Sequence, residues 1–83
     1  MDPLIIEARR FANALRAGEP KSDSPERSLL IALEPFLRTL EADGRPQRGS
    51  TEALGRFCVH SLDWSSPLYA RCVAIVERAR SRL

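Results

Sequence analysis

Two cysteines, Cys58 and Cys72, are the side chains of this sequence best suited by type to redox or metal chemistry. They lie at equal distances on either side of position 65, in the middle of a short polar turn, so an antiparallel helix pair would bring them close. Close cysteines could form a disulfide or half of a metal site. However, two ligands do not complete a zinc site, and disulfides are rare in a reducing cytosol. We therefore favour two small apolar side chains packed in a core over the redox alternative.

The single histidine, His60, is close along the chain to Cys58, Ser61 and Asp63, which include the residue types of a catalytic triad. On a helix His60 points roughly opposite to Cys58, and neighbouring helical residues do not face one another, so a nucleophile and its base could not meet. Paired carboxylates, glycine-rich phosphate loops and metal-binding motifs are also missing from the sequence. We expect no catalytic residue, cofactor or metal, and hence a protein that is not an enzyme.

Arginine accounts for twelve of the thirteen basic residues, and its planar group suits paired hydrogen bonds to carboxylate or phosphate. The net charge of +2 is too small to indicate nucleic-acid binding, but residues 1–43 carry a net −2 and residues 44–83 a net +4. Arg45, Arg48 and Ser50 come just before or at the start of a predicted helix, where they form a possible anion-binding site. A solvated flexible linker is the alternative interpretation of this segment.

Apolar residues recur at helical spacing in four stretches separated by polar linkers. Three stretches begin with a capping side chain followed by proline: Asp2-Pro3, Ser24-Pro25 and Ser66-Pro67. The spacing predicts helices over Pro3–Ala17, Pro25–Ala42, Thr51–Leu62 and Pro67–Arg82. The third would be capped by Ser50 or Thr51, and Pro35 would kink or split the second.

These elements predict a single all-α domain spanning residues 1–83, with four helices packed as two helical hairpins. A chain of 83 residues buries only about 60% of its unfolded surface, so self-association would help its stability. Apolar runs of signal-peptide or membrane-spanning length are not found. Together with the low cysteine content, this favours a cytoplasmic, bacterial-type protein.

Each predicted helix has one apolar residue outside its main apolar face, and two aromatic residues lie near the third turn. Tryptophan, tyrosine and arginine dominate protein-binding hot spots, and several exposed apolar residues that converge would form a patch for a partner. Trp64 could alternatively seal the end of the bundle. The candidate partner-binding residues are Ile6, Ile31, Val59, Trp64 and Tyr69, with Arg71 and Arg78 at the rim; Val73 is the misfit in the fourth helix.

By elimination, the sequence favours a small protein–protein interaction module, an adaptor, regulator or inhibitor of a larger protein that forms a homodimer. Its residues match no family motif closely enough to indicate a resemblance. The alternative is a small nucleic-acid-binding regulator. The turn between the third and fourth predicted helices has the length of a helix-turn-helix, and Arg71, Arg78 and Arg82 together with the Arg45/Arg48 loop could contact phosphates.

Overall fold

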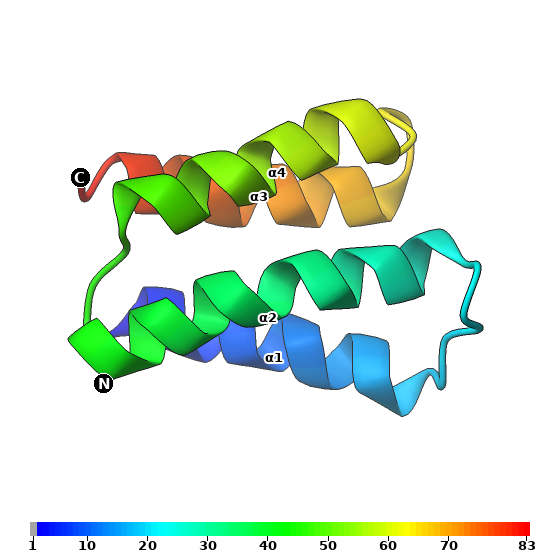
Figure 1. Ribbon diagram of the computed structural model, residues 1–83, viewed down its shortest axis with the longest axis horizontal. Coiled ribbons are helices and arrows are strands. Elements are labelled where there is room, and N and C mark those ends of the chain that lie inside the picture. Colours follow the sequence, from blue (N-terminus) through cyan, green and yellow to red (C-terminus); the bar gives the residue numbers. More distant parts are fainter. Residues whose placement is uncertain (1) are drawn as a thin grey trace.

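The computed structural model describes residues 2–83, which form four α-helices and no strand. They are α1 (Pro3–Ala17), α2 (Pro25–Asp43), α3 (Arg48–Ser61) and α4 (Pro67–Arg80). Figure 1 shows α1 and α2 as one antiparallel hairpin, α3 and α4 as a second, and the two hairpins as stacked layers. The helices form a ring in which α2 contacts α3 and α1 contacts α4. The all-α, four-helix prediction is confirmed, and no helix of the described residues is long and apolar enough to cross a membrane.

The three capped starts form as predicted. The Asp2 carboxylate accepts a hydrogen bond from the Leu4 amide at 2.9 Å. The hydroxyls of Ser24 and Ser66 each accept one, at 3.2 Å, from the amide three residues further on. Because a proline follows each cap and needs no hydrogen-bond acceptor for its nitrogen, these three helix starts are set locally.

The start of α3 differs from the prediction, because the helix begins at Arg48 rather than Thr51. Gln47 is its N-cap and makes no side-chain capping bond. The Ser50 hydroxyl is instead 3.0 Å from the Thr39 hydroxyl of α2 and donates to the Gln47 carbonyl at 3.3 Å. Thr51 is fully buried. The predicted cap by Ser50 or Thr51 is therefore wrong, because both side chains face neighbouring helices.

Pro35 lies inside α2 without splitting it, so the predicted split is wrong. Its ring is on the exposed side of the helix. The missing N–H would have bonded to the carbonyl of Ile31, a residue that is itself 58% exposed. Water can therefore hydrate that carbonyl, and the loss of one hydrogen bond does not leave a buried polar group unpaired.

The core is built from one apolar face of each helix, as the spacing predicts. Its largest fully buried apolar side chains are Leu4, Phe11, Leu29, Leu33, Phe36, Leu40, Leu54 and Ile75. The side chain of Arg80 on α4 lies close to Gly55 of α3. A Cβ atom at position 55 would be only 2.8 Å from a guanidinium nitrogen of Arg80. The glycine therefore leaves room for Arg80, which donates to the Glu52 carboxylate at 3.1 Å.

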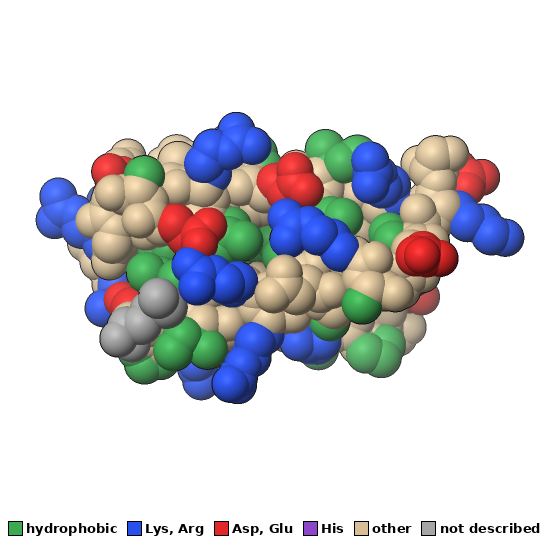
Figure 2. Space-filling model, turned by 90° about the horizontal axis from the view of Figure 1, so that it is seen from below, with side chains coloured by type: hydrophobic (Ala, Val, Ile, Leu, Met, Phe, Trp, Pro, Cys, Tyr) green, Lys and Arg blue, Asp and Glu red, His purple; other side chains and the backbone are tan. Residues whose placement is uncertain are grey.

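Ion pairs across the helix boundaries surround the core. On the face shown in Figure 2, α1 and α2 place acidic and basic side chains next to each other. Between these two helices Arg9 pairs with Glu41, and Arg16 pairs with Glu34 at 3.3 Å. In these two pairs, each arginine of α1 is matched by a glutamate of α2.

Candidate interaction surfaces

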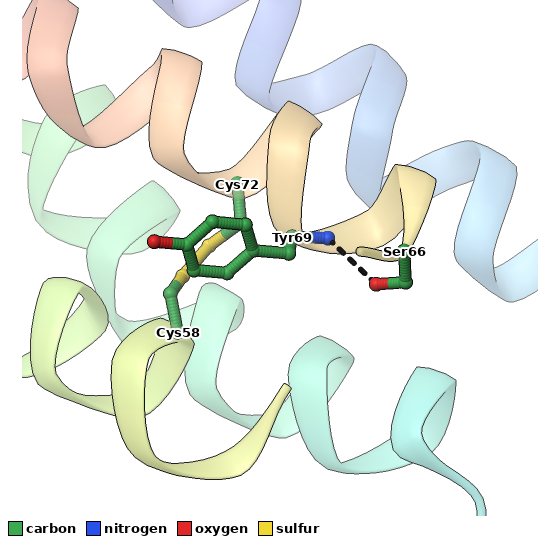
Figure 3. The surroundings of a disulfide bond; sticks show 4 residues. All are labelled: Cys58, Ser66, Tyr69 and Cys72. Carbon is green, nitrogen blue, oxygen red and sulfur yellow. Dashed lines mark hydrogen bonds between the residues drawn. A yellow bond between two sulfur atoms is a disulfide. The ribbon is translucent and has the colours of Figure 1, made fainter. Parts of the chain in front are cut away.

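Cys58 of α3 and Cys72 of α4 are fully buried and joined by a disulfide, with their Cα atoms 6.6 Å apart (Figure 3). Their predicted burial and proximity are confirmed, since the antiparallel hairpin aligns them across the α3–α4 boundary. The expectation of two unpaired thiols is wrong, because it rested on an assumed reducing compartment and not on geometry. With both cysteines paired, the low cysteine content no longer argues for a reducing cytosol.

Trp64 lies in the turn between α3 and α4 and is 67% exposed. Its indole N–H donates to the Val59 carbonyl at 2.9 Å, and its ring stacks on Tyr69 with centroids 6.2 Å apart and planes 27° apart. An indole this exposed does not seal the end of the bundle, so that alternative is wrong. Trp64 is instead a surface side chain whose orientation is fixed by two contacts.

The same side of the hairpin carries further apolar side chains. Val59 is 46% exposed, while Tyr69 and Val73, one helical turn apart on α4, are half-buried and pack against the core. In Figure 3 the Tyr69 ring extends along α4 toward the disulfide. Together these residues form a surface that we call the Trp64 patch, consisting of Val59, Trp64, Tyr69 and Val73.

The turn that carries Trp64 is held by its own side chains. The Asp63 carboxylate accepts hydrogen bonds from the backbone N–H of Ser65 at 2.9 Å and from the Ser65 hydroxyl at 2.8 Å. These bonds favour the ionised carboxylate and lower the pKa of Asp63. The turn therefore has a defined conformation next to the exposed indole.

Ile6, Arg71 and Arg78 lie away from the Trp64 patch, on the boundary between α1 and α4. The Arg71 guanidinium carbon is 4.5 Å from the centre of the Phe11 ring, and Arg78 pairs with Glu7. All three lie at the edge of one hollow of about 550 Å³. The two arginines therefore do not form a rim of the Trp64 patch.

Ile31 occupies a third place, on the exposed side of α2. Of the residues that the pattern places off the apolar faces, Ile31 and Val59 are exposed, whereas Ile6 and Val73 are half-buried. The pattern does not tell which of these residues lie together on one surface, because that depends on which helices are neighbours. The predicted single surface is in fact three locations.

The residues that line the possible anion-binding site also differ from those predicted. Arg45 and Arg48 line a hollow of about 270 Å³, where they are joined by Arg82 from the end of α4. Ser50 is turned toward Thr39 instead. Arg82 was predicted beside the Arg45/Arg48 loop only in the nucleic-acid alternative, and not as a member of the anion-binding site. The signal was available, since the start of one helix and the end of the next meet in an antiparallel hairpin.

Within residues 2–83, no three His, Cys, Asp or Glu side chains are grouped so that they could hold a metal ion. His60 is exposed near the end of α3. The two cysteines are joined to each other, which leaves neither as a free thiol. The hydroxyl of Thr51 is buried among the helices and has no hydrogen-bond partner in the described part of the chain.

Comparison with known proteins gives no relative: no family model, no curated protein and no solved structure matches the chain. The side chains and surfaces described above are therefore the basis for a functional proposal.

Proposed function

We propose that this protein is a small non-enzymatic interaction module that self-associates through the Trp64 patch and acts as an adaptor, regulator or inhibitor of a larger protein. The observation that carries the proposal is an indole that is 67% exposed and yet held in one orientation. Large aromatic side chains contribute most to protein interfaces when they are buried by a partner.

The contacts around Trp64 support binding because they reduce its cost. An exposed, freely rotating side chain loses conformational entropy when a partner immobilises it. Here the bond to Val59 and the stacking on Tyr69 already restrict the indole. The buried disulfide between Cys58 and Cys72 joins the two helices that carry these contacts. A partner would meet an aromatic surface that is largely ordered in advance.

A second copy of this chain is the occupant that the charges favour. The four residues of the Trp64 patch carry no formal charge. Elsewhere on the α3–α4 boundary, Arg80 is paired with both Glu52 and Glu77. Two such faces can meet about a twofold axis without strong repulsion between like charges. The arginine-lined boundary of α1 and α4, by contrast, would repel a copy of itself.

Sedimentation velocity over a range of protein concentrations tests this proposal. We expect the wild-type chain to form a dimer at high micromolar concentration, and Trp64→Ser to weaken the dimer at least about tenfold, which is a loss of about 1.4 kcal/mol. Ile31→Ser is the matched control, because Ile31 is nearly as exposed but lies on α2. That variant should dimerise as the wild type does.

Two results would contradict the proposal. A wild-type chain that stays monomeric at every concentration would rule out self-association through any surface. Equal weakening by Trp64→Ser and Ile31→Ser would show that the dimer does not use the Trp64 patch. Circular dichroism of each variant establishes that the helices are intact.

A further inference from the structure

Three hollows follow one another along the boundary between α1 and α4 and around its end. The first, of about 550 Å³, shares Pro3 and Arg78 with a second of about 480 Å³. The second shares Arg82 with the hollow of about 270 Å³ beside the start of α3. Since neighbouring hollows have lining residues in common, the three lie side by side, and we call them together the arginine groove.

The arginine groove is strongly basic. Its arginines come from α1, from α4 and its end, and from the start of α3 and the loop before it: Arg10, Arg71, Arg78, Arg82, Arg45 and Arg48. Two carboxylates, Glu7 and Asp2, line it as well, so the lining carries a net +4. The rest of the chain has seven basic and nine acidic residues, a net −2. The positive charge of the molecule is therefore concentrated here.

Part of this charge has no internal partner. Arg78 pairs with Glu7, and Arg82 pairs with Asp2. Across the described residues, 2–83, no ion pair joins a carboxylate to the remaining four arginines, which are Arg10, Arg45, Arg48 and Arg71. By comparison, the hollow between α1 and α2 is lined by two arginines and two glutamates. Arg27, Arg38 and Arg56, which lie outside the groove, also form no ion pair within residues 2–83, so the groove is distinguished by the net +4 charge of its lining.

Arg71 shows how the groove could hold a carboxylate. Its guanidinium carbon lies 4.5 Å from the centre of the Phe11 ring, which is itself buried. A guanidinium that contacts a ring through its face still has N–H donors in its plane. The contact with Phe11 limits the motion of the side chain, so that a carboxylate could be bound by paired hydrogen bonds at a smaller entropic cost.

We propose that the arginine groove binds an acidic, amphipathic segment of a partner protein. Apolar residues line the groove between the arginines: Pro3 and Ile6 in the first hollow, and Pro46 and Leu83 in the third. Such lining suits apolar side chains flanked by carboxylates. A nucleic-acid backbone, which carries a phosphate at each nucleotide, would leave the apolar lining unused. The observations therefore favour an acidic peptide over nucleic acid.

Fluorescence anisotropy with defined probes tests the inference. The first probe is a labelled twelve-residue peptide in which two leucines are flanked by glutamates. The second replaces the glutamates with glutamine, the third replaces the leucines with serine, and the fourth is a labelled DNA duplex. We expect the first peptide to bind at least about tenfold more tightly than each of the other three probes. Amide shifts of Ile6, Arg10 and Arg71 in NMR spectra should locate the binding.

Charge-matched variants separate the groove from the overall charge. Arg10→Glu with Arg71→Glu should weaken binding of the first peptide at least about tenfold. Arg38→Glu with Arg56→Glu makes the same change in net charge at exposed arginines outside the groove, and should leave binding nearly unchanged. Because Arg71 contacts the buried Phe11, the variant Arg45→Glu with Arg48→Glu repeats the test at two exposed positions of the third hollow.

The inference is overturned if the first peptide does not bind or if the duplex binds more tightly than this peptide. It is also overturned if the variant with Arg38→Glu and Arg56→Glu loses as much affinity as the variant with Arg10→Glu and Arg71→Glu. Tighter binding of the duplex would identify a nucleic-acid surface. The inference rests on the proposed function, because it assumes that the partner is a protein. The experiments nevertheless distinguish a failure of the proposed dimer from a failure of peptide binding. Trp64→Ser should keep its affinity for the peptide whatever its oligomeric state, and the arginine variants should keep the dimer.

Discussion

Thr51 carries the one buried side-chain polar atom that lacks a hydrogen-bond partner within residues 2–83. Its side chain is fully buried, and its hydroxyl oxygen has no hydrogen-bond partner among the described residues. Valine has nearly the same shape and a similar helix propensity but no hydroxyl. We expect Thr51→Val to raise the free energy of unfolding by about 1 kcal/mol, because an unpaired polar group no longer has to be buried. Urea denaturation followed by circular dichroism measures the change.

Thr39 is the matched control for this substitution. It is also a helical threonine, but its hydroxyl donates to the Phe36 carbonyl at 2.9 Å and lies 3.0 Å from the Ser50 hydroxyl. Thr39→Val should therefore lower the stability by about 1 kcal/mol. If both valine variants shifted stability in the same direction, the hydrogen-bond explanation would be wrong.

Single residues also show what sequence can predict. The caps at Asp2, Ser24 and Ser66 form with atoms two or three residues away, so the local pattern is sufficient. The role of Ser50 depends on Thr39, eleven residues away on another helix, and local patterns do not contain that information.

At the scale of elements, the disulfide should be the main covalent contribution to the stability of the α3–α4 hairpin. Cys58 and Cys72 are 14 positions apart, and closing a loop of this length lowers the entropy of the unfolded chain. The double variant Cys58→Ala with Cys72→Ala should lose about 3 kcal/mol of unfolding free energy. Urea denaturation with and without reductant measures this loss.

The wild type and the double cysteine variant serve as controls for each other. Reduced wild type should be destabilised by a comparable amount, while the double variant should not respond to reductant. A wild-type chain whose stability is the same with and without reductant, and which shows two reactive thiols when denatured in air, would contradict the disulfide.

The helices themselves were largely predictable, and the errors have physical causes. α1, α2 and α4 begin at the predicted residues because a cap and a proline mark each start. α3 has no proline at its start, and it begins at Arg48 rather than at the predicted Thr51. Of the two outcomes expected at Pro35, the split does not occur, since α2 is continuous through it, and the sequence pattern does not tell whether the freed carbonyl faces water.

At the scale of the whole molecule, the order of the helices around the ring decides which surfaces exist. Because α1 lies next to α4, Arg10 and Arg71 line one hollow although they are far apart in the sequence. For the same reason Ile6 is separated from Trp64. The residues of the Trp64 patch lie on one predicted hairpin, so they could be grouped from the sequence, whereas the arginine groove needs the contact between α1 and α4, which the hydrophobic pattern does not predict.

The ion pairs that close the ring predict how stability depends on pH. A hydrogen bond from Arg82 lowers the pKa of Asp2, and this pair joins the start of α1 to the end of α4. Hydrogen bonding from Arg80 likewise lowers the pKa of Glu52 on α3. A carboxyl whose pKa is lower in the folded chain contributes stability above its unfolded pKa, which is about 4, and loses that contribution as the pH falls through the folded pKa.

We therefore expect the Tm of the wild type to be nearly constant from about pH 7 to pH 5 and to fall below about pH 4. Asp2→Asn should have a lower Tm than the wild type near pH 7, and this difference should shrink as the pH falls, because protonation removes the same interaction in the wild type. Asp23→Asn is the control, since Asp23 is exposed and forms no ion pair within residues 2–83. Scanning calorimetry at a series of pH values measures these differences. A gap between wild type and Asp2→Asn that stayed constant down to about pH 2 would show that the charge of Asp2 does not stabilise the ring.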